Sequence, residues 1–237
     1  MNHEVIADEE QLKQFIAWLP DLEDNEKYYV CLFARKKYSP DSGLTNDKTQ
    51  LKRFTSNKER LIEKLRQLEI PRGYWTLKGD VEAPQEALAL YISVNPRCMK
   101  KATEMMGKRC WDLINSNNYN LHAEAMSCIQ KSKSRTYYVD FDIDDKTIEM
   151  DTDWLDQEIG AGSYSIIETR GGFHLLVKPE LASDYRKRHH NNRNWYQQIQ
   201  SKYPVDQSGD QLLPVVGAVQ GGFVPRFVKM KVGRRSG

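Results

Sequence analysis

Apolar residues recur at helical spacing in several segments of the chain. In residues 8–19, the side chains of Leu12, Phe15, Ile16 and Leu19 fall on one side of a helix, because positions three and four apart share a face. Helices are also predicted over residues 58–68, 99–115, 121–130, 152–159 and 184–201. Between several of these predicted helices lie segments whose composition is typical of strands.

Runs that are rich in β-branched and aromatic residues predict strands between these helices. They lie at residues 27–34, 87–94, 135–143, 163–168 and 173–177. The polar stretch 38–50 is expected to be a loop. Strands interleaved with helices indicate a mixed α/β or α+β fold. A break near residue 130 would divide the chain into an N-terminal α/β module, 1–130, and a strand-rich catalytic module, 131–237, which together are expected to form one compact domain.

Composition indicates a globular protein. Of the 237 residues, 39% are hydrophobic and 29% are charged, which is not the balance of a disordered chain. No apolar run reaches the roughly 18–20 residues of a membrane span. The N-terminal residues are acidic and have no signal-peptide pattern, so we expect a cytoplasmic protein without a transmembrane segment.

The four cysteines form no C-x-x-C pair and are expected to be reduced thiols. Three of them and one histidine suggest a zinc site as an alternative, formed by Cys98, Cys110, His122 and Cys128. Their spacing is not that of a zinc knuckle, which disfavours this alternative.

Charge is unevenly distributed although the net charge is only +2. Residues 140–158 contain nine acidic residues and one lysine. Basic residues gather elsewhere, at 35–37, 97–101, 131–135 and 186–188. A concentrated acidic site among basic clusters suits a metal enzyme that acts on a polyanion. The alternative for each basic cluster is a solvated helix face.

The acidic segment begins with three alternating aspartates, Asp140, Asp142 and Asp144, in the sequence YYVDFDIDD. A calcium loop of the EF-hand type also alternates acids, but here Gly and Glu are missing from their required positions and the flank is strand-like. In a strand, Asp140 and Asp142 share one face, about 7 Å apart at the backbone. Such a pair suits two cations about 3.5–4 Å apart, whereas the alternative is an edge strand kept soluble by its charges.

A second motif follows at residues 169–174, with the sequence TRGGFH. Glycine permits a tight turn and close backbone approach to a ligand, and Gly172 immediately precedes the next strand. Thr169, Arg170 and His174 carry groups that donate hydrogen bonds to phosphate. A structural histidine inside the strand is the alternative for His174.

A third acid follows a short Pro-Val segment at Asp206 and could complete a metal site with the aspartate pair. Asp210 competes for this role, although its Ser-Gly-Asp context is typical of a turn. Tyr185, Trp195 and Tyr196, amid basic residues, form a candidate surface for stacking single-stranded template. The alternative is a helix whose aromatic face packs in the core.

The order of these motifs resembles the archaeo-eukaryotic primase superfamily, which includes replicative primase subunits, phage and plasmid primase-polymerases and the polymerase domain of bacterial end-joining ligases. The matching stretches are Val139–Asp142, Thr169–His174 and Val205–Asp206, and Leu90–Arg97 resembles a strand of the phage and plasmid members. The resemblance covers about residues 88–228. It implies a primase-polymerase-like catalytic core with an RRM-like sheet.

The resemblance also implies roles for individual residues. Asp140, Asp142 and Asp206 would bind two Mg²⁺ or Mn²⁺ ions, and His174 would contact the triphosphate of the incoming nucleotide, with Thr169, Arg170 and Gly172 beside it. The implied activity is template-dependent nucleotidyl transfer in DNA replication, as a DNA primase or polymerase. Its partners would be single-stranded DNA, nucleoside triphosphates and a replicative helicase, in a bacterial or phage-infected cell.

One departure from the family supports an alternative function. Many phage and plasmid members carry an arginine before Pro-Gly after the third acid, where this chain has Leu212–Gly217; Arg226 is a possible substitute. A catalytically reduced protein that binds single-stranded nucleic acid is therefore the alternative. A rolling-circle nickase is disfavoured, because His174 is not paired with a second histidine across one hydrophobic residue.

Overall fold

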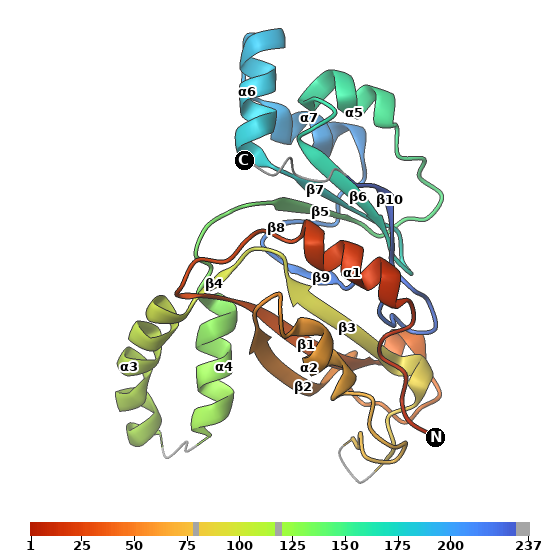
Figure 1. Ribbon diagram of the computed structural model, residues 1–237, viewed down its shortest axis with the longest axis vertical. Coiled ribbons are helices and arrows are strands. Elements are labelled where there is room, and N and C mark those ends of the chain that lie inside the picture. Colours follow the sequence, from red (N-terminus) through yellow and green to blue (C-terminus); the bar gives the residue numbers. More distant parts are fainter. Residues whose placement is uncertain (78–80, 117–119, 231–237) are drawn as a thin grey trace.

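A computed structural model describes residues 1–77, 81–116 and 120–230, which form two antiparallel sheets with helices around them (Figure 1). The first sheet has the order β2-β1-β3-β9. Its strands are β1 (Glu26–Arg35), β2 (Lys48–Ser56), β3 (Leu88–Ser93) and β9 (Leu212–Pro214). The short β4 (Arg97–Cys98) pairs with the start of β1. Because β9 lies far along the chain, this sheet takes strands from both sides of residue 130.

The second sheet has the order β10-β6-β7-β5-β8, and each neighbouring pair is antiparallel. Its strands are β5 (Val139–Ile143), β6 (Tyr164–Glu168), β7 (Phe173–Val177), β8 (Gln207–Gly209) and β10 (Arg226–Lys229). The predicted α+β class is therefore confirmed.

Seven α-helices lie in the described residues: α1 (Glu9–Trp18), α2 (Leu61–Arg66), α3 (Met99–Asn115), α4 (Leu121–Lys131), α5 (Thr152–Ile159), α6 (Pro179–His189) and α7 (Trp195–Lys202). Two 3₁₀ turns, η1 (Lys36–Tyr38) and η2 (Gln85–Ala87), precede β2 and β3. The helix α1 begins where the Asp8 carboxylate accepts a hydrogen bond from the Gln11 amide at 3.0 Å, which satisfies an otherwise unpaired N–H of the first turn. No helix in the described ranges is long and apolar enough to cross a membrane.

The helix α1 joins the two sheets. Its buried residues Leu12 and Phe15 belong to a core that also contains Ile167 of β6 and Leu176 of β7. The Trp18 indole N–H donates to the Ser165 hydroxyl at 3.0 Å. Burial of these apolar side chains is the main force that holds the second sheet against the first.

Side-chain alternation gives the second sheet one apolar and one mixed face. Phe141, Ile143, Leu175 and Val177 pack in a second core against residues of α5, α6 and α7, as Figure 1 shows above the sheet. The intervening residues face the other way, toward the first sheet. This face carries the aspartates of β5 and the histidine of β7, as the alternation in the sequence predicts.

The first sheet also has two distinct faces. Along β1, Tyr28, Val30 and Leu32 enter the core that contains α1. Tyr29 and Cys31 point to the opposite side, where they pack with residues of α4. Farther along β1, the residues on this second side form part of the wall of a cleft between the two sheets.

Two predicted elements differ from the structure. The predicted loop 38–50 ends early, because β2 begins at Lys48 and forms a mostly polar edge strand. The single helix predicted over 184–201 is interrupted between α6 and α7, where Asn191 has a φ of 53°. A positive φ is incompatible with a continuing right-handed helix, and asparagine adopts it more readily than most residues.

Candidate functional site

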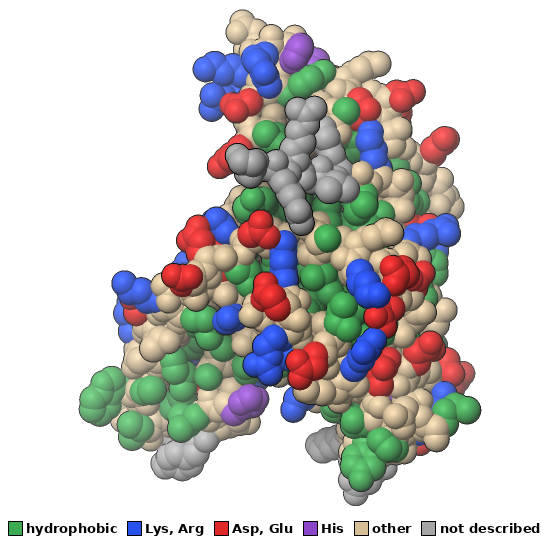
Figure 2. Space-filling model, in the orientation of Figure 1, with side chains coloured by type: hydrophobic (Ala, Val, Ile, Leu, Met, Phe, Trp, Pro, Cys, Tyr) green, Lys and Arg blue, Asp and Glu red, His purple; other side chains and the backbone are tan. Residues whose placement is uncertain are grey.

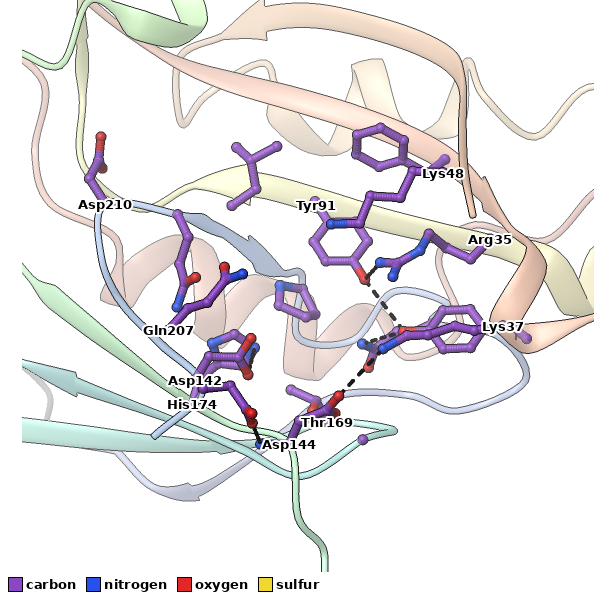
Figure 3. Close-up of a pocket in the computed structure, with 18 of the residues that line it drawn as sticks. Arg35, Lys37, Lys48, Tyr91, Asp142, Asp144, Thr169, His174, Gln207 and Asp210 are labelled. Carbon is purple, nitrogen blue, oxygen red and sulfur yellow. Dashed lines mark hydrogen bonds and ion pairs between the residues drawn. The ribbon is translucent and has the colours of Figure 1, made fainter. Parts of the chain in front are cut away.

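A cleft of about 830 Å³ lies between the two sheets. Figure 3 shows Asp142, Asp144 and His174 on one side of the cleft, and Arg35, Lys48 and Tyr91 of the first sheet with Lys37 of η1 on the other. The cleft therefore has an acidic wall that faces a basic wall.

Three carboxylates form the acidic wall: Asp142 on β5, Asp144 just after it and Asp206 just before β8. The Asp206 amide donates to the Asp142 carbonyl at 2.9 Å. The Asp206 Oδ2 atom accepts from the Asp144 amide, also at 2.9 Å. These bonds bring the third predicted acid beside the first strand motif, although 62 residues separate Asp144 from Asp206.

Asp142 lies among several other charged groups of the cleft. Burial raises the pKa of its carboxyl, and the neighbouring charges of Asp140, Asp144 and Asp206 raise it further, whereas His174 opposes them. A bound cation would relieve this repulsion, and carboxylate oxygens are the ligands that Mg²⁺ and Mn²⁺ prefer.

Asp140 lies deeper than the other acids and is fully buried. Its two carboxylate oxygens lie 2.9 and 3.0 Å from Nδ1 of His174. The other ring nitrogen, Nε2, lies 3.5 Å from Asp142 Oδ1 at the cleft. His174 thus links a buried carboxylate to a carboxylate of the acidic wall.

The protonation of His174 follows from this position. Burial disfavours a charged imidazole, but the carboxylates of Asp140 and Asp142 outweigh it and raise the pKa of His174. A proton on Nδ1 is donated to Asp140, because a carboxylate can only accept. This bond fixes the ring orientation and directs Nε2 toward the cleft.

The polar groups of the predicted phosphate-binding turn have partners within the protein. The Thr169 hydroxyl lies 3.2 Å from the Gly172 carbonyl and 3.3 Å from the Gly172 amide. The Arg170 guanidinium donates to the Gly221 carbonyl and lies 4.6 Å from the centre of the Tyr38 ring. Thr169 and Gly171 line the cleft, so the turn shapes the acidic wall.

The two glycines of this turn predict different effects of a methyl group. A Cβ at Gly172 would lie 1.9 Å from the Ile143 carbonyl oxygen, which is backbone that cannot move freely. A Cβ at Gly171 would meet the end of the Asp144 side chain, which can rotate away. We expect Gly172→Ala to lower the free energy of unfolding by about 1–3 kcal/mol, and Gly171→Ala to lower it less. Chemical denaturation of both variants tests this prediction. Equal losses of unfolding free energy would contradict the difference expected between the two glycines.

Asp210 has structural partners. It accepts from Arg97 at 2.5 and 3.3 Å and from the Asn95 side-chain amide at 3.0 Å. Asn95 is fully buried and also accepts from the Tyr137 and Tyr138 amides. The geometry therefore favours Asp206 over Asp210 as the third acid of the cleft.

The aromatic residues proposed for template stacking lie away from the cleft. Trp195 is buried in the second core, and Tyr196 packs against Phe141 with ring centres 5.0 Å apart. The Tyr185 ring lies 4.3 Å from that of His189. Figure 2 shows Lys and Arg side chains gathered at the end of the molecule where α6 lies. Arg226 pairs with Glu168 at 2.7 Å, with its side chain mostly exposed.

Sequence reasoning missed two parts of the cleft. Asp144 was part of the aspartate pattern but received no role of its own. The sequence shows Arg35 and Lys37 only as a basic cluster, and Lys48 falls within the polar stretch 38–50 that is predicted to be a loop. No pattern in the sequence identifies Lys48, because its place opposite Arg35 follows from the pairing of β1 with β2.

No group of three or more His, Cys, Asp or Glu side chains within the described ranges is already arranged to hold a metal ion. The cysteines there are free thiols, and Cys31 and Cys128 are buried. The donor chemistry of Asp142, Asp144 and Asp206 nevertheless fits a hard divalent cation, because all three carboxylates line the cleft and the charges of Asp144 and Asp206 act on Asp142.

Comparisons of the chain with protein-family models, with curated proteins and with solved structures gave no match.

Proposed function

We propose that this protein is a template-dependent nucleotidyltransferase, a DNA primase or primase-polymerase that makes or extends primers on single-stranded DNA. The observation that carries this proposal is the cleft itself. Three carboxylates on one wall face three cations on the other, and the space between them is about 830 Å³. A nucleoside triphosphate with divalent metal needs these two kinds of surface, because carboxylates hold the metal and cations bind phosphate oxygens.

Asp142 and Asp206 would hold Mg²⁺ or Mn²⁺, with Asp144 beside them. When bound, two such ions neutralise phosphate charge and stabilise the attacking and leaving oxygens of an in-line displacement. Asp140 was expected to be a ligand as well, but its carboxylate lies on His174 Nδ1. In this proposal Asp140 orients the imidazole instead.

The protein's own residues would bind and position the substrate. His174 presents Nε2 beside Asp142, where a proton on that nitrogen can be donated to a phosphate oxygen. The raised pKa of His174 favours the doubly protonated ring that makes this donation while keeping the bond to Asp140. The second sheet, with helices on one face and these groups on the other, supports the RRM-like arrangement that the family resemblance implies.

Primer synthesis tests the proposal. Wild-type protein is incubated with single-stranded DNA, nucleoside triphosphates and Mg²⁺ or Mn²⁺, and product lengths are measured. Asp206→Asn is expected to lower incorporation by about tenfold to a hundredfold, because it removes one charged ligand. Glu149→Gln removes the same charge from an exposed position near the acidic segment and should leave synthesis unchanged. Equal activity of the two variants would contradict the role of Asp206 as a metal ligand.

The burial of Asp140 favours a second candidate function. The Asp140 carboxylate is paired with His174, and residues Leu212–Pro214 form the apolar strand β9. The cleft therefore offers fewer catalytic groups than the family pattern. A primase-fold subunit that binds single-stranded DNA without chemistry would have this arrangement. Binding of single-stranded DNA with no incorporation under either metal would support this second candidate.

A further inference from the structure

The basic wall of the cleft concentrates three cations where β1 meets β2. Arg35 and Lys48 are direct partners across the antiparallel strands, and Lys37 follows in η1. Like charges placed opposite each other on neighbouring strands destabilise a sheet. These residues therefore carry an electrostatic cost that an anion between them would offset.

Arg35 is the fixed member of this group. Its side chain is only 7% exposed. Its guanidinium donates to the Tyr91 hydroxyl at 2.8 Å and to Asp47 at 3.1 Å. The guanidinium carbon lies 5.5 and 5.9 Å from the ring centres of Tyr38 and Tyr91, and Nε is buried without a hydrogen-bond partner among the described residues. The structure thus holds a positive charge rigidly at the base of the wall.

Lys37 and Lys48 are the adjustable members. Figure 3 shows the Lys48 side chain extending from β2, and the Lys37 side chain from η1, into the cleft. Lys37 Nζ lies 3.8 Å from Asp144 Oδ2, and its side chain is 43% exposed. Both ammonium groups can therefore follow a ligand into the cleft.

Nearby acids do not fully neutralise the charge of these three cations. Burial lowers the pKa of Lys48, and the charges of Arg35 and Lys37 lower it further, while Asp47 and Asp142 only partly oppose them. Asp47, which pairs with Arg35, has a side chain that is 56% exposed, so solvent screens much of its charge.

We propose that Arg35, Lys37 and Lys48 form a polyphosphate site that binds the triphosphate of a nucleotide. The nucleotide identity of the ligand rests on the proposed function, whereas the binding of a compact polyphosphate rests on this cluster. Rigid arginine and flexible lysine together suit phosphate, because the guanidinium offers a fixed donor array and ammonium groups adjust to the remaining oxygens.

The placement of charge favours a compact ligand over a nucleic-acid backbone. The three cations meet at one end of the cleft, where Lys37 and Arg35 are drawn in Figure 3. At the end where Asp210 lies, Arg97 is already neutralised by that carboxylate. Lys131 is the one other lysine or arginine of the described cleft lining outside the cluster. A strand of DNA would need free cations along the whole groove, whereas a triphosphate needs them at one place.

Binding of inorganic tripolyphosphate tests this site without nucleotide or catalysis. Titration calorimetry in the presence of EDTA is performed on wild-type protein, on Lys48→Gln and on Lys37→Gln/Lys48→Gln. Each lost lysine is expected to weaken binding by about tenfold, the effect of one charged contact. Lys52→Gln is the matched control, because Lys52 is an exposed lysine of the same strand outside the cleft lining. Thermal melts check that each variant is folded.

A second arm measures the affinity of the same variants for a single-stranded oligonucleotide by fluorescence anisotropy. We expect this affinity to change less than twofold. Absence of tripolyphosphate binding to wild type, or equal binding by the double variant and Lys52→Gln, would overturn the proposal. Loss of oligonucleotide affinity with tripolyphosphate binding intact would assign the cluster to the DNA backbone and overturn it as well. Lysine-dependent tripolyphosphate binding without nucleotide incorporation would support the site and contradict the proposed function.

Discussion

Asp142→Asn is expected to reduce nucleotide incorporation by at least about a hundredfold, the largest activity loss of any single change in the cleft. Asp142 lies beside Asp206, Asp144 and His174, so its charge contributes to every part of the acidic wall. Asparagine keeps the shape of the side chain but is a much weaker ligand for a divalent ion. A loss of this size corresponds to about 2.7 kcal/mol of transition-state stabilisation, and steady-state incorporation rates at saturating Mn²⁺ measure it.

The same substitution is expected to stabilise the metal-free protein at neutral pH. The pKa of Asp142 is raised above its ordinary value of 3.8, so between that value and the folded-state pKa the folded protein binds more protons than the unfolded chain. Its stability therefore falls as pH rises through this range, and above it the charged carboxylate remains unfavourable. Asparagine removes this cost. Melting temperatures in EDTA should exceed those of wild type at pH 7 and converge with them below about pH 4; a variant that is less stable at pH 7 would contradict the assignment.

The sequence pattern predicted that Asp140 and Asp142 lie on one face of a strand, because strand alternation is local. Asp140 and Asp142 share a face wherever the segment forms a strand, and the apolar residues between them identify which face is buried. The partner of Asp140 is not local. It follows from the register of β5 with β7, which places Asp142 opposite His174 and Asp140 opposite Leu176. The histidine then reaches the buried acid diagonally, and no single-strand pattern contains that information.

The basic wall was harder to predict for a related reason. The strand β2 is a polar edge strand with alternating exposed positions, and edge strands of this kind lack the apolar residues that identify buried strands. Without β2, nothing in the sequence pairs Lys48 with Arg35. The same limit applies to Arg170, whose partners Gly221 and Tyr38 come from distant segments.

The buried pair of His174 and Asp140 predicts the largest effect on stability. The sequence leaves two roles open for His174, a phosphate ligand or a structural histidine inside the strand. In the structure, His174→Ala would leave the fully buried Asp140 carboxylate without its partner. Removing one member of a buried charged pair costs about 3–5 kcal/mol, because the remaining charge stays desolvated. We expect this loss in the free energy of unfolding, measured by urea denaturation, whereas the exposed control His122→Ala should change it by less than about 0.5 kcal/mol.

A double-mutant cycle separates loss of the pair from loss of packing. Asp140→Ala removes the buried charge, so adding it to His174→Ala should recover part of the stability, and the interaction energy between the two sites should reach about 1–3 kcal/mol. If the imidazole only filled space, the two losses would add. If His174→Ala unfolded at the same urea concentration as wild type and only weakened nucleotide use, the imidazole would be a free ligand of the cleft and the buried pair would have no energetic role. The expected coupling instead makes the orientation of Nε2 at the cleft depend on an acid that the substrate does not reach.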